Sequence, residues 1–296
     1  MFNGNETYKS PEKPIVKLDR MMEGIAQRLN AELIESGESP LLEKDNSINI
    51  EFFREVDFDI KNDKDKIQKM ETEWSGANIP NVQEYYRDKF GVEGAEEITK
   101  KYIENKNKDT NALVERAITG VLHNILKSEF LVMRSCVYDD YFNGFDNVIV
   151  NKETGDVICA FDEVHDEEDK RYQAKKLEKI KKISQRGGAT LKYGVTFKKD
   201  ESTGEKKLIK KTIKNIPVFY LSLSNSELNG LLSGMNFDID GKASREELAV
   251  FDKLLLSLDE QAKILEKEKI PFGVRENLTK SKNLFQQMKK LRLRNE

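Results

Sequence analysis

The stretch from residue 138 to residue 166 constrains the fold of this chain more than any other. It contains two short apolar runs, 148–150 and 157–161, separated by a polar turn that ends at Gly155. Two such runs around a glycine-containing turn predict a β-hairpin. Acidic residues precede the first run and follow the second, so antiparallel pairing would bring them side by side.

These acids predict a site for a divalent cation. Asp146 opens the first predicted strand, and Asp162 and Glu163 end the second. Hard cations are bound by several carboxylate oxygens that converge on one point. Because side chains alternate across a strand, only one of Asp162 and Glu163 can face Asp146, and the sequence leaves open which one. The alternative is that all three are ordinary solvated residues at the end of a hairpin.

The elements around the hairpin predict an α/β (α+β) core. Apolar residues at helical spacing follow Thr110, and Glu115 lies at the edge of their stripe together with Thr119 and His123. A Gly187-Gly188 pair is typical of a helix end. The expected order is helix 112–133, strand 135–142, the hairpin, helix 167–184, strand 189–197, a lysine-rich segment 198–214 and strand 216–223.

This order resembles that of the restriction-endonuclease-like nucleases, the PD-(D/E)XK superfamily, over residues 110–223. In that comparison Asp146 matches the first acid of the family motif, and Asp162 or Glu163 matches the second. Glu115 matches an acid that the first helix often supplies. The resemblance implies a mixed sheet, a bound Mg²⁺ or Mn²⁺, and hydrolysis of phosphodiester bonds in DNA or RNA.

The sequence departs from the family motif at its lysine. Val164 occupies that position if Asp162 is the ligand, and His165 occupies it if Glu163 is the ligand. His165 could then serve as a general base or a ligand. Alternatively, a lysine of the following helix, Lys175, Lys176 or Lys179, could reach back to the site, as the resemblance allows.

Three regions are expected: a helical accessory region at 1–109, the restriction-endonuclease-like core at 110–223 and a C-terminal helical region at 224–296. Residues 165–296 carry an excess of lysine and arginine, whereas the preceding residues carry an excess of acids. A basic half beside an acidic strand cluster suits an enzyme that acts on a polyanion. The same asymmetry is also common in proteins that never bind nucleic acid.

A second candidate metal site is the loop 236–247, NFDIDGKASREE, which fits the EF-hand pattern for Ca²⁺. Its first position is Asn236, and no second loop of this kind is found in the sequence. A capping box formed by Ser244 and Glu247 at the start of the next helix explains the same residues, and we favour it.

Composition excludes several other classes. The sequence has no apolar run long enough to span a membrane and no signal segment at its beginning, so we expect a cytoplasmic protein. Cys136 and Cys159 lie in apolar runs and are expected to be buried thiols. We find no P-loop, dinucleotide fingerprint, zinc spacing or serine or cysteine nucleophile signature.

The sequence therefore predicts a metal-dependent nuclease with nucleic acid as its partner. The alternative is a catalytically inactive nucleic-acid- or protein-binding module of the same fold, with a structural Ca²⁺ at 236–247 as a further option. The oligomeric state and the choice between DNA and RNA stay open.

Overall fold

The computed structural model describes residues 12–35, 37–56, 58–165, 170–199 and 206–295. Its centre is a four-stranded mixed sheet in the order β1 (Phe130–Arg134), β2 (Asn147–Asn151), β3 (Val157–His165) and β6 (Val218–Leu223). The first three strands are antiparallel, and β6 is parallel to β3. A parallel neighbour requires a crossover, which here contains α7 (Lys170–Gln185). The expected mixed α/β class is confirmed.

The β2–β3 hairpin forms where the sequence predicted it. Asn147 lies opposite Phe161, and the backbone N–H of Asp146 donates to the carbonyl of Phe161 at 2.7 Å. This register places Asp146 and Asp162 at the same end of the hairpin. The turn is closed at Gly155, which has a φ of 71°.

A second, two-stranded sheet packs against the hairpin turn. It consists of β4 (Ala189–Lys199) and β5 (Lys206–Ile216), so the lysine-rich segment is largely a strand. The backbone of β4 passes so close to the turn that a Cβ on Gly155 would lie 2.1 Å from the nitrogen of Phe197. Glycine is therefore required at this turn by both its positive φ and its surroundings.

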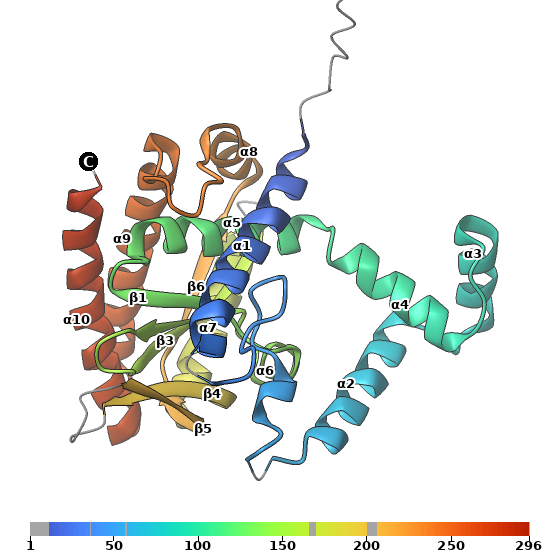
Figure 1. Cartoon of the computed structure of the whole chain (residues 1–296), viewed down its shortest axis with the longest axis horizontal. Coiled ribbons are helices and arrows are strands. Elements are labelled where there is room, and N and C mark those ends of the chain that lie inside the picture. The colour runs from blue at the N-terminus through green and yellow to red at the C-terminus, as the bar shows by residue number, and fades with distance from the viewer. Residues whose placement is uncertain (1–11, 36, 57, 166–169, 200–205, 296) are drawn as a thin grey trace, which may run out of the picture.

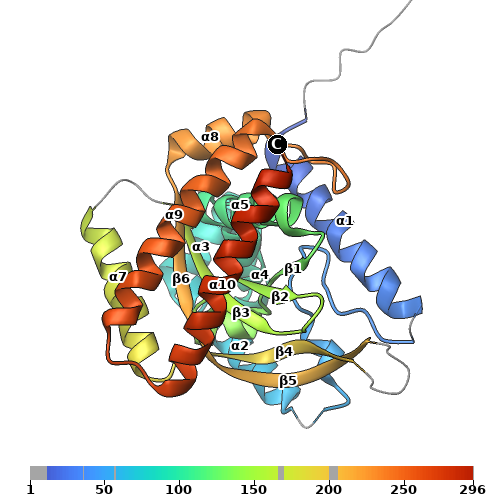
Figure 2. The ribbon, with the colours of Figure 1, turned by 90° about the vertical axis from the view of Figure 1, so that its left-hand side faces the viewer.

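Helices bury the sheet and join all three expected regions in one hydrophobic cluster, which includes Met22, Val121, Phe219 and Phe285. The helices are α1 (Pro14–Glu35), α5 (Thr110–Leu126), α8 (Asn225–Gly234), α9 (Arg245–Lys267) and α10 (Phe272–Arg294). Figure 2 shows α9 and α10 running side by side in front of the sheet. None of the described helices is both long and apolar enough to cross a membrane.

The basic face of α10 is largely used inside the protein. Lys282, Lys289 and Arg292 form ion pairs with Glu266, Asp259 and Asp252 of α9, respectively. These three bases are therefore paired with acids of α9 and are not free to contact a polyanion.

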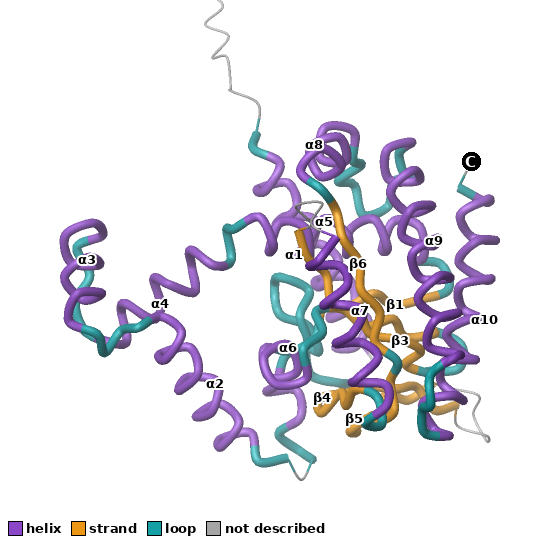
Figure 3. Tube along the Cα trace, turned by 180° about the vertical axis from the view of Figure 1, so that it is seen from behind, coloured by secondary structure: helices purple, strands orange, loops and turns teal. Residues whose placement is uncertain are grey.

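Three helices form an arm that projects from the core, α2 (Ile60–Ser75), α3 (Pro80–Phe90) and α4 (Ala95–Lys106) (Figures 1 and 3). The arm has a small hydrophobic cluster of its own, around Ile98. At its base Asp63 is fully buried and accepts hydrogen bonds from Tyr193, at 2.7 Å, and from Lys192 of β4.

Two local predictions were wrong. Residues 135–142 do not form a strand: β1 ends at Arg134, and α6 (Val137–Asn143) follows it. Cys136 accepts from the N–H of Asp139 as the N-cap, and Gly144 ends the helix with a φ of 69°. The predicted helix 112–133 accordingly stops at Leu126, because its last residues belong to β1.

The close approach at the hairpin turn gives a test of the fold. We expect Gly155→Ala to lower the free energy of unfolding by about 3 kcal/mol or more, because it adds a backbone clash to an unfavourable φ. Gly91 also has a positive φ, 67°, but nothing lies within 4 Å of the position of its missing Cβ. Gly91→Ala should therefore cost about 1 kcal/mol. Equal losses for the two variants in urea denaturation would contradict the packing described.

The base of the arm gives a test of pH dependence. Burial alone would raise the pKa of Asp63, but the hydrogen bonds from Lys192 and Tyr193 outweigh it and hold the pKa below its ordinary value. Stability from such a group is present above its unfolded pKa of about 3.9 and is lost as pH falls through the lower folded pKa.

We expect Asp63→Asn to destabilise the protein by about 2 kcal/mol at pH 7 and by progressively less below about pH 4. Asp65 lies exposed on the same helix, so Asp65→Asn serves as the control and should change little. Thermal denaturation from pH 3 to pH 7 measures both. A loss for Asp63→Asn that does not shrink in acid would contradict the ion pair.

Candidate functional site

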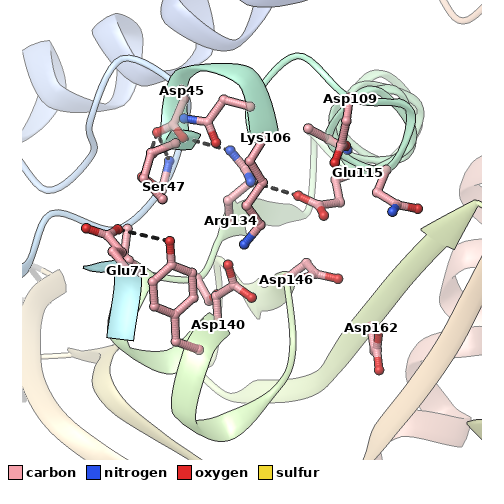
Figure 4. Close-up of a pocket in the computed structure, with 17 residues that line it drawn as sticks. Asp45, Ser47, Glu71, Lys106, Asp109, Glu115, Arg134, Asp140, Asp146 and Asp162 are labelled. Carbon is pink, nitrogen blue, oxygen red and sulfur yellow. Dashed lines mark hydrogen bonds and ion pairs between the residues drawn. The ribbon is translucent and has the colours of Figure 1, made fainter. Parts of the chain in front are cut away.

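A cavity of about 310 Å³ lies where the acid-bearing end of the hairpin meets α5, α6 and the arm (Figure 4). Its lining is rich in charge. Two bases line it, Lys106 and Arg134, together with seven acids, Asp45, Glu71, Asp109, Glu115, Asp140, Asp146 and Asp162. Such a concentration of buried or half-buried carboxylates is costly unless cations accompany them.

Three residues predicted from the sequence meet in this cavity. Glu115 comes from α5, Asp146 from the start of β2 and Asp162 from β3. The side chains of Glu163 and His165 lie outside the part of the chain that the structure describes. The hairpin register and the packing of α5 on the sheet account for this meeting.

Arg134, at the end of β1, neutralises one side of the cavity. Its guanidinium donates to Asp45 at 2.7 Å and to Glu115 at 2.9 Å. Its Nε is buried without a hydrogen-bond partner among the described residues. Although burial works against its charge, these acids raise the pKa of Arg134, so the guanidinium stays charged.

Two carboxyl groups of the cavity, those of Glu115 and Asp140, retain protons more readily than usual. Burial raises the pKa of Glu115 to about 7, with Arg134 opposing the shift and the charge of Asp140 adding to it. Burial also raises the pKa of Asp140, whose side chain is hydrogen-bonded to that of Asp146. Figure 4 shows these two aspartates beside each other. Adjacent carboxyl groups that cannot all ionise are short of positive charge, which a divalent cation would supply.

Lysines of α7 hold Asp162. The Nζ of Lys176 lies 2.8 and 2.9 Å from the two carboxylate oxygens of Asp162, and the Nζ of Lys179 lies 2.9 Å from one of them. Lys175, the third residue of this group, is exposed. The structure therefore brings two of the three candidate lysines to the site, spaced one helical turn apart, and leaves Lys175 on the outer face.

Asp140 is a site residue that sequence reasoning missed, because 135–142 was assigned to a strand. It lies next to Asp139, and the two side chains have different environments. Asp139 is fully buried and accepts the backbone N–H groups of Lys192, at 2.8 Å, and Tyr193, at 3.0 Å. Asp139 thus fastens α6 to β4, and Asp140 on the next position lines the cavity.

The donor set suits a hard divalent cation, but in the present arrangement protein cations pair with two of the acids, Glu115 and Asp162. Within the described residues, no three carboxylate, imidazole or thiol groups stand close enough together to hold one metal ion. Glu115 faces Arg134, and Asp162 faces Lys176 and Lys179. A metal would bind by drawing Glu115, Asp140 and Asp146 together, and Asp162 toward them.

His123 belongs to another part of α5 from Glu115. It borders a separate cavity of about 60 Å³ together with Lys127 and Lys152. Burial and the nearby charge of Lys127 lower the pKa of His123 to about 4, so this imidazole is neutral at pH 7. It plays no part in the acidic cavity.

The capping box at 244–247 is confirmed. Ser244 and Glu247 exchange the two hydrogen bonds that define it, and Glu247 is fully buried. Glu247 also accepts from the backbone N–H of Asn236 at 3.1 Å, and Lys127 donates to the carbonyls of Ile239 and Gly241. The ammonium of Lys127 therefore already occupies carbonyl oxygens of this loop as a hydrogen-bond donor. The Ca²⁺ prediction stays a prediction.

Comparisons with known proteins give no further assignment. No family model matches the chain, and searches of curated proteins and of solved structures found no match.

The contrast between the two neighbouring aspartates is testable by thermal denaturation. Asp139→Asn should lower stability by about 2 kcal/mol, because an amide oxygen cannot accept all the hydrogen bonds that the carboxylate accepts. Asp140→Asn should leave stability unchanged or raise it by about 1 kcal/mol at pH 7, since it removes a charge that burial disfavours. Destabilisation by Asp140→Asn as large as that by Asp139→Asn would contradict the roles assigned.

Proposed function

We propose that this chain is a metal-dependent nuclease that hydrolyses phosphodiester bonds in DNA or RNA. The observation that carries the proposal is that Glu115, Asp146 and Asp162 line one cavity, and that two lysines of α7 pair with Asp162. Carboxylates and a lysine at one end of a small sheet form the kind of site that binds a metal next to a scissile phosphate.

The topology supports the same proposal. From α5 onward the chain runs helix, three antiparallel strands and helix, and β6 then adds parallel to β3. This is the arrangement that the resemblance to the restriction-endonuclease-like superfamily implies. Two insertions distinguish the chain, α6 between β1 and β2 and the β4–β5 sheet between α7 and β6. We therefore propose a restriction-endonuclease-like core with these additions.

Each charged group has a role in the proposed reaction. Asp146, with Glu115, Asp140 and Asp162, would hold Mg²⁺ or Mn²⁺, which lowers the pKa of a bound water and stabilises charge on the phosphate. Lys176 and Lys179 keep positive charge beside Asp162 and replace the lysine that the strand lacks. Arg134 orients Glu115 and provides positive charge facing an incoming phosphate.

The competing function is a catalytically inactive binding module of the same fold. The observation that favours it is the full pairing of Glu115 and Asp162 with protein cations, which satisfies the acids without a metal. The two functions predict different effects on hydrolysis when Asp146 is replaced by an uncharged residue. Loss of a metal ligand abolishes hydrolysis, whereas a binding module has no hydrolysis to lose.

Cleavage assays with a matched variant decide between them. We expect the wild type to cut labelled DNA or RNA in Mg²⁺ or Mn²⁺ and to be inert in EDTA. Asp146→Asn should reduce the rate at least about 100-fold. Glu153→Gln changes an exposed acid in the turn of the same hairpin and should retain full activity. Intact single- and double-stranded DNA and RNA in every metal, from a folded wild type, would contradict the nuclease and favour the binding module.

A further inference from the structure

The arm builds one wall of the acidic cavity. Glu71 of α2 and Ile103 and Lys106 of α4 line it opposite Asp140 and Tyr141 of α6. The hydroxyl of Tyr141 donates to Glu71 at 3.0 Å, which joins the two walls. Side chains of the arm are therefore part of the wall that a substrate bound at the acids would contact.

Two aromatic rings lie at this junction. Trp74 of α2 and Tyr141 of α6 meet edge to face, with centroids 4.7 Å apart and planes inclined by 65°. Trp74, the single tryptophan of the chain, is 44% exposed in spite of this contact. Large exposed aromatic surfaces beside a site for a polyanion are the platforms on which proteins stack nucleobases.

Lys106 adds a cation to the same junction. Its Nζ lies 4.8 Å from the ring centroid of Tyr141 and 5.0 Å from that of Trp74. Among the described residues it makes no hydrogen bond and no ion pair, in contrast to Arg134, Lys176 and Lys179. Its charge acts on the nearby acids Glu71, Glu115 and Asp140 without a direct ion pair. Its ammonium can therefore also contact a phosphate, and the two rings fix its position.

We propose that Trp74, Tyr141 and Lys106 form a subsite for one unpaired nucleotide, so that the substrate of the proposed nuclease is single-stranded nucleic acid. The base stacks on Trp74, and Lys106 pairs with the phosphate next to the one that is cut. That the bound strand is cut rests on the proposed function, whereas binding of the strand at this subsite does not.

Size and stacking favour a single strand over a duplex. Tyr141 and Lys106 line the cavity of about 310 Å³, which is at the small end of ligand sites and has the arm as one wall, and Trp74 packs against Tyr141 outside that lining. A base offers its face to a protein ring after it leaves its neighbours, which a single strand allows at little cost and a duplex resists. The lining of the cavity has seven acids and two bases, so it would repel a phosphate backbone. A bound divalent cation is therefore needed for the strand to enter.

Fluorescence of the single tryptophan reports directly on this subsite. The measurement uses the full-length wild type with Mg²⁺ and strands whose backbone linkages resist hydrolysis, so that the cation stays bound and the strands stay intact. The protein is titrated with such dT and U oligonucleotides and with a duplex of equal length. We expect saturable quenching by at least one single strand, with an affinity at least about 10-fold higher than for the duplex.

Variants separate stacking from other causes of quenching. Anisotropy of a labelled strand should show binding weakened about 10-fold or more by Trp74→Ala and by Lys106→Ala, and largely restored by Trp74→Phe. Tyr85 is 49% exposed at the far end of the arm, so Tyr85→Ala is the matched control and should bind as the parent does.

The outcomes distinguish this inference from the nuclease proposal. Strand binding that quenches Trp74, with no cleavage by the wild type, keeps the subsite and overturns the reaction. Cleavage of duplex and single strand alike, with Trp74→Ala binding as tightly as Tyr85→Ala, keeps the reaction and overturns the subsite. Failure of every strand to bind overturns both.

Discussion

Negative charge gathered at one end of a small sheet is the constraint on which the rest of this structure depends. The β2–β3 register brings Asp146 and Asp162 to the same end, and α5 adds Glu115. Carboxylates out of water are unfavourable unless they are paired, hydrogen-bonded or protonated. Arg134 and the lysines of α7 supply the pairing, while burial, with the charge of Asp140 adding to it, still raises the pKa of Glu115.

Much of the fold was predictable because it follows from local patterns. The two apolar runs and the glycine turn of the hairpin, and the apolar stripe of α5, are visible in the sequence and recur in the structure. The meeting of Asp146, Asp162 and Glu115 was predictable for the same reason, since it requires the hairpin register and one packed helix. To predict the order of the strands in the sheet, the resemblance to a known family was needed as well.

The rest depended on contacts between distant residues. The run 135–142 contains residues that suit a strand, but the caps at Cys136 and Gly144 and the anchoring of Asp139 by β4 make it a helix. Asp140 was missed as a consequence. The choice between Lys175, Lys176 and Lys179 depends on the rotation of α7 against β3, which the sequence does not specify. The contribution of the arm through Glu71 and Lys106 is likewise tertiary.

The central claim is that these acids bind a divalent cation when their ion pairs with Arg134, Lys176 and Lys179 open. A measurement of metal binding tests it most directly. Electron paramagnetic resonance of Mn²⁺ measures the free ion in the presence of the wild type, Asp146→Asn and Glu153→Gln. The account predicts at least one bound Mn²⁺ for the wild type and for Glu153→Gln, and a large loss of affinity for Asp146→Asn. Free Mn²⁺ at the same level with all three proteins, and with buffer, would contradict it.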